Sequence, residues 1–291
     1  MFNIIEKKWY FLGFSGIIIL AGLISLFAQG LNWDIDFTGG TSLQISLGQQ
    51  FENSEIEQLV AGVIDGKVSV QKAGNEGTEV IIKTGELDAE KLRGVYTAIA
   101  EKYAIEDINS AVISADNFSA IVGKDLRESA IWASIIAALL MLIYISFRFE
   151  LLSAVSAILA LAHDVLVLLA VYSIFQISVN LTFVAALLTI LGYSINDTIV
   201  IFDRVRENLK TSKKESVADV ANKSVWQTMR RSVYTSATTI VTILALYVLG
   251  VPSIREFALP LIIGITFGTY SSIFIACPLW IMLSGEDKKK A

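Results

Sequence analysis

A group of polar side chains stands near the end of a long uncharged apolar segment. Within Gly192–Thr198, the side chains of Tyr193, Ser194, Asn196 and Asp197 supply hydroxyls, an amide and a carboxylate among aliphatic neighbours. An ionisable group at membrane depth costs roughly 2.5 to 3.5 kcal/mol, so it normally faces a bundle interior or water and has a partner. The combination predicts movement of an ion or a proton across a membrane.

The spacing of these residues supports a shared helical face but leaves a structural alternative open. Tyr193 and Asp197 are four residues apart and would lie on one side of a helix. Asn196 and Asp197 could instead hold a neighbouring helix in place, a common use of polar residues in membrane bundles. We favour a transfer role for Asp197 because a carboxylate can change its protonation state and an amide cannot.

Two further polar pairs interrupt or border apolar segments. His163 and Asp164 stand in the middle of one such segment, and Arg230 and Arg231 stand just before another. Adjacent helical residues point about 100° apart, so His163 and Asp164 are not expected to share one site unless the helix kinks, and both a functional and a structural role stay open. Arg231 is either a partner for Asp197 or an ordinary basic flank.

The elements that must position these groups are membrane helices. The chain has 291 residues, of which 54% are hydrophobic and only 18% charged. A bilayer core about 30 Å thick requires about 20 apolar helical residues. Six segments qualify, which predicts a polytopic α-helical membrane protein with six transmembrane helices. They are Trp9–Ala28, Ala130–Phe147, Leu151–Phe175, Ser178–Phe202, Tyr234–Val251 and Phe257–Leu283.

The first segment is expected to be a retained helix. Lys7 and Lys8 precede it and Ala28 follows it, as in a signal peptide, but it is longer than the usual signal core of about 7 to 15 residues. The predicted organisation is a cytoplasmic N-terminus with the first helix (1–28), an outer domain (29–129), a helical bundle (130–283) with a cytoplasmic loop (203–233), and a basic cytoplasmic tail (284–291).

Basic residues predict the orientation, since short loops rich in Lys and Arg stay in the cytoplasm. Arg255 is the only basic residue in the short connections of the opposite side. Both termini are therefore expected to be cytoplasmic, and residues 29–129 to lie outside. The basic residues on the termini's side are Lys7, Lys8, Arg148, Arg204, Arg206, Lys210, Lys213, Lys214, Lys223, Arg230, Arg231, Lys288, Lys289 and Lys290.

The outer segment shows alternating strand patterns and amphipathic helix patterns. Their order is β-α-β-β-α-β, which predicts a ferredoxin-like α+β domain. Asn53 or Ser54 is expected to cap the first helix and Asp88 the second. The predicted strands are Thr41–Leu47, Lys67–Lys72, Thr78–Lys83 and Ile108–Ser114, and the first helix runs to Ile64.

Two connecting segments stand out. Asp36, Phe37, Gly39 and Gly40 lie in the junction between the first helix and the outer domain, and paired glycines permit either a stiff turn or a hinge, the turn being favoured. Residues 203–233 mix many basic with fewer acidic side chains and are expected to form a short amphipathic helix on the cytoplasmic surface.

Several classes of chemistry are disfavoured. The sequence has no phosphate-binding Gly-x-x-x-x-Gly-Lys-Ser/Thr loop, so ATP consumption is not expected. Its single histidine and single cysteine, Cys277, offer no zinc set and no disulfide. We expect no enzyme activity, no cofactor and no metal. The net charge of −5 argues against nucleic acid as a partner. The remaining energy source is an ion gradient, worth about 2.3 kcal/mol per charge per 100 mV.

Four stretches together resemble the SecD/SecF family of the resistance-nodulation-division superfamily. The resemblance covers nearly the whole chain, and the absence of an extra-long outer segment favours the branch that pairs with SecD. Trp226 and Ser232 stand where that family more often has asparagine and threonine. The four stretches are Asp36–Gly40, His163-Asp164, Gly192–Glu207 and Ser224–Ser232.

The resemblance implies a function and the roles of two residues. It implies a subunit of the bacterial or archaeal cytoplasmic membrane that, with SecD and a SecYEG-type translocon, uses the proton motive force to promote late steps of polypeptide export. Asp197 takes the position of the proton-carrying carboxylate and Arg231 that of its basic partner, with Arg230 as the alternative. A small-solute or lipid exporter of the same superfamily, or a non-transporting scaffold, stays as another hypothesis.

Overall fold

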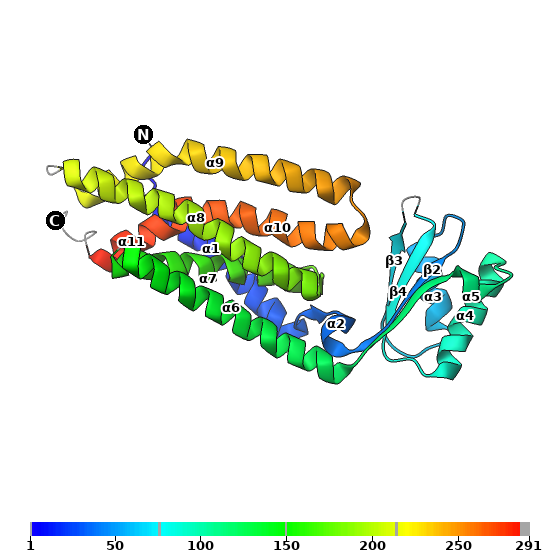
Figure 1. Ribbon diagram of the computed structural model, residues 1–291. Helices are drawn as coiled ribbons and strands as arrows, with labels where there is room; N and C mark the ends of the chain where they lie inside the picture. Colours follow the sequence, from blue (N-terminus) through cyan, green and yellow to red (C-terminus); the bar gives the residue numbers. More distant parts are fainter. Residues whose placement is uncertain (1, 75–76, 149, 213–214, 286–291) are drawn as a thin grey trace. The chain divides into compact units, whose positions relative to one another are not determined.

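The computed structural model describes residues 2–74, 77–148, 150–212 and 215–285 (Figure 1). The chain divides into two compact units. The first joins the residues up to Asn32 to Trp132–Val248 and to the residues from Glu256 onward; the second contains Trp33–Ile131 and Leu249–Arg255. Most of the predicted basic tail, from residue 286 onward, and Lys213 and Lys214 of the predicted loop lie outside the described residues.

Over the described residues, six helices are long and apolar enough to cross a membrane, as predicted. The last of them contains a π-helical turn, where each backbone N–H bonds one residue further back than in an α-helix. The six are α1 (Lys8–Gln29), α6 (Ala120–Arg148), α7 (Leu151–Ile174), α8 (Leu181–Thr211), α9 (Val217–Leu249), and α10 (Pro252–Ser271) continued by η1 (Ser272–Ala276) and α11 (Cys277–Ser284).

Small residues determine where these helices pack against one another, and side-chain caps determine where they begin. An ideal Cβ on Gly22 of α1 would lie 2.0 Å from Cβ of Ala170 on α7, so glycine is what permits these two helices to touch. Asn180 begins α8, its Oδ1 accepting the backbone N–H of Phe183 at 2.9 Å. α7 and the last membrane helix (Pro252–Ser284) are the two most enclosed of the six, each with more than half of its apolar window buried.

The prediction of a short surface helix within residues 203–233 is wrong. α8 continues to Thr211 and α9 already begins at Val217, so the charged segment extends two membrane helices. The apolar stripe continues past the first charges, with Val205 buried on α8 and Val225 on α9, and packing holds both segments helical. α6 likewise begins at Ala120 rather than at Ala130.

The second unit contains a four-stranded antiparallel sheet of order β3-β4-β2-β5. The strands and longer helices follow one another along the chain in the predicted order. Short elements precede the sheet or lie in the first unit: β1 (Asn32–Trp33), α2 (Ile35–Thr38) and β6 (Ser178–Val179). The main elements are β2 (Gly40–Ser46), α3 (Asn53–Ala61), β3 (Val68–Ala73), β4 (Glu79–Thr84), α4 (Ala89–Tyr103), α5 (Ile108–Ala111) and β5 (Val112–Phe118).

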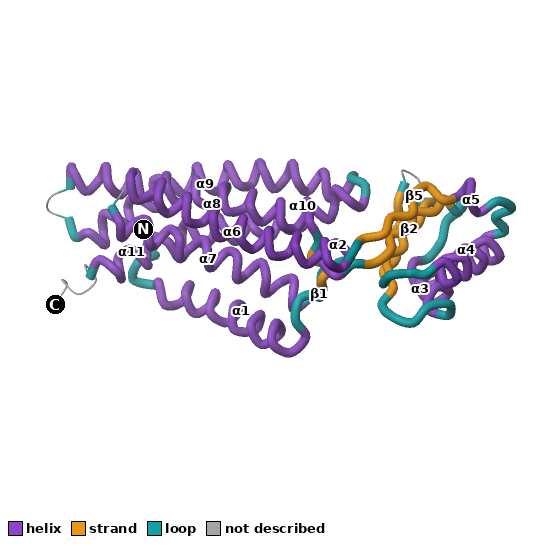
Figure 2. The backbone as a smooth tube through the Cα atoms, turned by 60° about the horizontal axis from the view of Figure 1, so that its bottom comes forward, coloured by secondary structure: helices purple, strands orange, loops and turns teal. Residues whose placement is uncertain are grey.

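One face of the sheet carries the core of this unit. Alternate residues of β2 and β4, Leu43 and Ile82 among them, are fully buried against Ile56 of α3 and Val95 of α4. Figures 1 and 2 show α3 and α4 on the same side of the sheet. A strand pattern of period two and two helix stripes thus meet in a single apolar layer.

Local capping corrects two details of the predicted elements. Asp88 begins α4 as predicted, because its Oδ1 accepts the backbone N–H of Lys91 at 2.8 Å. Neither Asn53 nor Ser54 caps α3, which follows Glu52 without a side-chain cap. The strand predicted from Ile108 begins only at Val112, because Asp107 accepts the backbone N–H of Asn109 at 3.0 Å and starts the short helix α5.

Candidate functional site

Asp197 lies inside the helical unit, where three helices meet. Only 4% of its surface is exposed, and it comes from the middle of α8. Ser236 of α9 donates a hydrogen bond to Asp197 Oδ2 at 3.5 Å, a long contact. Thr269 of α10 in turn donates to Ser236 Oγ at 2.6 Å. The carboxylate is therefore enclosed but only weakly held.

A second hydroxyl near this position has no partner. Ser232 stands one helical turn before Ser236 on the same face of α9 and is fully buried. Its Oγ makes no hydrogen bond within the described part of the chain. Buried polar atoms without partners are rare in native proteins and call for a functional explanation.

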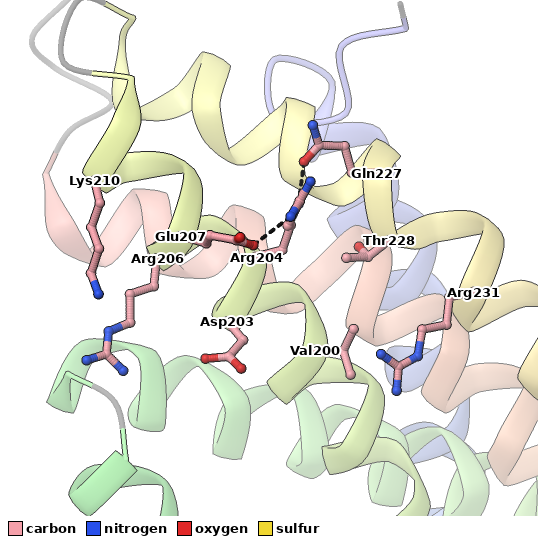
Figure 3. Close-up of a pocket in the computed structure, with 9 residues that line it drawn as sticks. All are labelled: Val200, Asp203, Arg204, Arg206, Glu207, Lys210, Gln227, Thr228 and Arg231. Atoms are coloured by element: carbon pink, nitrogen blue, oxygen red, sulfur yellow. Dashed lines mark hydrogen bonds and ion pairs between the residues drawn. The ribbon is translucent and has the colours of Figure 1, made fainter.

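Arg231 lines a cavity of about 660 Å³ between α8 and α9 (Figure 3). No ion pair between Arg231 and Asp197 exists among the described residues. Figure 3 shows the Arg231 side chain extending toward Val200, which stands three residues after Asp197 on α8. Arg230 instead lies over the ring of Tyr234, 5.2 Å from its centroid. Of the two arginines, Arg231 is the one beside the helix that carries Asp197.

The other predicted members of the group divide between different surroundings. The Tyr193 hydroxyl is 3.1 Å from Thr239 Oγ1 and so connects α8 to α9. Asn196 is exposed and points away from the bundle interior. Ser194 donates to Asp164 Oδ2 at 2.6 Å rather than to Asp197. The structure therefore brings neither Asn196 nor Ser194 to the Asp197 carboxylate.

Asp164 is the centre of a second buried cluster that joins four helices. Its Oδ2 accepts hydrogen bonds from Ser194 of α8 and, at 2.9 Å, from Ser271 of α10. Asp164 Oδ1 lies 2.9 Å from His163 Nδ1, and His163 Nε2 lies 2.8 Å from Ser15 Oγ on α1. Both oxygens of this carboxylate therefore have partners, three in all, in contrast to the single long hydrogen bond of Asp197 among the described residues.

The expectation that His163 and Asp164 cannot share one site is wrong. α7 is a continuous α-helix through both residues, yet their side chains are hydrogen-bonded to each other. The 100° between their Cα–Cβ directions is bridged because the long histidine side chain turns its ring back toward the carboxylate. The length of the side chain, which the angle between the two residues does not describe, decides whether they make contact.

A π-helical turn stands next to the Asp164 cluster. Ser271 ends α10 and Ser272 begins η1, and Ser272 Oγ lies 2.9 Å from Thr198 Oγ1 on α8. Such turns occur frequently at functional sites. Sequence reasoning missed Ser15, Ser236 and Ser271, although small hydroxyl residues within apolar segments are a usable signal for interhelical contacts.

The Gly39-Gly40 junction is tightly packed in the second unit. Both glycines have positive φ, +78° and +150°. An ideal Cβ on Gly39 would lie 2.6 Å from the backbone nitrogen of Ala120, and one on Gly40 would lie 2.2 Å from the carbonyl oxygen of Thr84. Asp36 and Phe37 belong to the short helix α2, with Phe37 buried. This geometry favours the stiff turn over the hinge.

No group of three or more His, Cys, Asp or Glu side chains in the described ranges is placed to hold a metal ion. The arrangement instead offers two buried carboxylates with different surroundings and one arginine beside a cavity. A weakly held buried carboxylate suits proton or ion exchange, because few bonds must break when its charge changes.

Two family profiles match this chain. Residues 98–286 match the family described as protein export membrane protein SecD/SecF, C-terminal. Residues 24–50, which include the Gly-Gly junction, match the SecD/SecF GG motif.

Relatives of known name match over nearly the whole chain. The protein translocase subunit SecF of Alicyclobacillus acidocaldarius is 41% identical over 100% of this chain and 95% of its own length. That of Sebaldella termitidis is 42% identical over 95% of this chain and 90% of its own. The protein translocase subunit SecDF of Bacillus subtilis is 35% identical over 98% of this chain but only 38% of its own.

Solved structures show the same fold. The crystal structure of SecDF from Thermus thermophilus, a translocon-associated membrane protein, aligns with a TM-score of 0.84 and 32% identity over 98% of this chain. A second structure, of SecDF in a super-membrane-facing form, aligns with a TM-score of 0.73 and 32% identity. In both cases this chain spans 39% of the length of the solved chain.

Proposed function

Because the chain belongs to the SecD/SecF family of protein-export membrane proteins, we propose that it is a protein translocase subunit that draws on the proton motive force. The observation that carries the proton step is the state of Asp197. It is a carboxylate buried inside the bundle, held by one long hydrogen bond and close to a hydroxyl that has no partner.

The proposed cycle changes the partner of Asp197. When the carboxyl carries a proton it is neutral, and Ser236 suffices as its neighbour. When the proton leaves, the negative charge needs compensation, and Arg231 is the nearest candidate because it lies on the adjoining helix beside Val200. Proton release would therefore draw α9 and α8 together around a new ion pair, shifting the population between two helix arrangements.

A SecD partner is supported by the lengths of the relatives. The chain corresponds to 38% of the Bacillus subtilis SecDF chain and 39% of the Thermus thermophilus one. We propose that a separate SecD subunit supplies the remainder and that the pair acts beside a SecYEG-type channel on a translocating polypeptide. The lipid bilayer of the cytoplasmic membrane surrounds it, with both termini in the cytoplasm, as the basic connections indicate.

The second unit is the part of the chain that we propose acts on the polypeptide. Its sheet order β3-β4-β2-β5 with α3 and α4 on one face supports a ferredoxin-like domain. We place this domain outside the membrane. The packed Gly39-Gly40 turn would transmit helix movements to it, because a stiff connection moves with the elements it joins.

The experiment is secretion of a Sec-dependent precursor in cells that lack their own gene for this subunit. Wild type, Asp197→Asn, Arg231→Met and the control Arg230→Met are compared at matched membrane levels. We expect Asp197→Asn and Arg231→Met to lose export while still co-purifying with SecD. Arg230→Met should keep export, because Arg230 lies against Tyr234 rather than beside α8.

Full export by both Asp197→Asn and Arg231→Met would overturn the proton-coupled function and leave a scaffold. Loss of export by Arg230→Met to the same degree would show that basic charge at this end of α9, rather than the position of Arg231, is what matters.

A further inference from the structure

The cavity that Arg231 lines contains further charged residues that the proton step does not use. We call it the basic cavity; it is formed by α8 and α9 and has a volume of about 660 Å³. Four basic side chains line it, against two acidic ones. Arg204 donates hydrogen bonds to Glu207 Oε2 at 2.5 Å and to Gln227 Oε1 at 2.6 Å. The nine lining residues are Val200, Asp203, Arg204, Arg206, Glu207, Lys210, Gln227, Thr228 and Arg231.

A second, smaller pocket of about 270 Å³ adjoins the basic cavity and shares two of its residues. Arg206 and Lys210 line both. Figure 3 shows these two side chains together on one flank of the basic cavity, with Arg231 on the opposite flank. Four of its eight lining residues are apolar, and we call it the apolar slot. Its other lining residues are Glu150, Ser153, Phe202, Val205, Leu209 and Trp280.

Trp280 lines the apolar slot and carries a buried donor. Its side chain is packed edge-on against Phe202 and only 6% exposed. The indole Nε1 has no hydrogen-bond partner within the described residues. A buried indole N–H usually finds an acceptor, and the ester carbonyl of a lipid is one that would lie between an apolar and a polar region.

We propose that the basic cavity and the apolar slot together bind one anionic phospholipid. Its phosphate lies in the basic cavity, and its glycerol esters and first acyl carbons lie in the apolar slot. A phosphodiester matches the excess of positive charge, and basic pockets between membrane helices are known to bind such headgroups. A guanidinium group can donate two parallel hydrogen bonds to phosphate oxygens, so an arginine of the basic cavity is the expected ligand of the phosphate.

The adjoining pair of pockets distinguishes a lipid from a small anion. Inorganic phosphate would occupy only the basic cavity and leave the apolar slot and the Trp280 N–H unfilled. A zwitterionic lipid brings an ammonium group that opposes the surrounding arginines and lysine. The combination of charge and apolar lining therefore favours a lipid with a net negative headgroup.

The test measures lipid binding to the full-length chain in a neutral detergent by native mass spectrometry, so it is independent of export. Phosphatidylglycerol and phosphatidylcholine with identical acyl chains are compared. We expect preferential retention of one phosphatidylglycerol. Lys210→Gln should weaken it about fivefold, since one basic residue contributes about that much to anionic-lipid binding. Trp280→Phe should weaken it as well.

The matched control is Arg230→Gln, which removes an exposed charge at the same end of α9 but outside both pockets. Equal retention of both lipids, or equal loss in Arg230→Gln and Lys210→Gln, would overturn the proposal. If inorganic phosphate alone bound as strongly as phosphatidylglycerol, the proposal would be overturned in favour of a soluble-anion site. Lys210→Arg restores the charge, so its binding must return if the loss in Lys210→Gln is electrostatic rather than a folding defect.

Discussion

At the residue scale, the two buried carboxylates differ in how firmly they are held. Asp164 accepts from Ser194 and Ser271 and pairs with His163, whereas Asp197 has one hydrogen bond, at 3.5 Å, within the described ranges. A carboxylate whose two oxygens both have close partners resists rearrangement, and one that is held by a single long hydrogen bond accepts a new partner at lower cost. We therefore assign a structural role to Asp164 and the exchanging role to Asp197.

The first prediction separates these roles. Asp164→Asn should lower the free energy of unfolding by about 1–2 kcal/mol, because two interhelical hydrogen bonds, which average about 0.6 kcal/mol each within membranes, and the contact with His163 on the same helix are disturbed. Asp197→Asn should change stability less. Thermal unfolding of the purified full-length variants in one detergent measures both, and equal melting temperatures would remove the distinction.

At the element scale, the Gly39-Gly40 turn joins the short helix α2 to β2, an inner strand of the sheet. The second prediction is that Gly40→Ala destabilises the second unit by about 1–3 kcal/mol, because its φ of +150° and the 2.2 Å approach to Thr84 leave no room for a methyl group. Gly85→Ala is the control, since nothing lies within 4 Å of its added Cβ. Hydrogen exchange of the β2 and β4 amides should accelerate only in the first variant.

An ion pair between α3 and α4 gives the third prediction. Lys102 Nζ lies 2.6 Å from Glu55 Oε1, and this hydrogen bond and charge hold the pKa of Glu55 below its ordinary value. The stabilisation is thus present above the ordinary pKa of a glutamate and is lost as the pH falls through the lowered value. Glu55→Gln should be less stable than wild type near neutral pH and equal to it in acid.

Denaturant unfolding, followed by a probe in the second unit at neutral and acidic pH, checks this dependence. Glu57→Gln, on the same helix but without an ion pair in the described ranges, should show no such convergence. A constant difference between wild type and Glu55→Gln at both pH values would contradict the prediction.

At the scale of the whole molecule, the N-terminal segment is tied to the beginning of α9, more than 200 residues later in the chain. The backbone N–H of Ile4 donates to Asn222 Oδ1 at 2.9 Å, and Trp226 Nε1 donates to the carbonyl of Phe2 at 2.8 Å. Ile4 and Ile5 are buried in the same core as α9. The N-terminal segment therefore closes the bundle at the end that carries Arg231.

The fourth prediction tests this closure. Asn222→Ala should lower the free energy of unfolding by about 1–3 kcal/mol, because the buried N–H of Ile4 loses its acceptor. Lys223→Ala removes only an exposed ion pair with Glu215 and should cost less than about 1 kcal/mol. The melting temperatures of the two variants test this directly. An equal decrease in both would mean that the buried Asn222 contact stabilises the protein no more than the exposed ion pair does.

The sequence alone predicted the six apolar helices and the order of strands and helices in the second unit, because apolar length and period are local properties of the chain. It also singled out Asp197, Arg231 and Asp164. It could not place Ser194 beside Asp164, turn Asn196 outward or pair His163 with Asp164. Those outcomes depend on how far each helix is rotated about its axis and on the reach of its side chains, and only packing against other helices decides both.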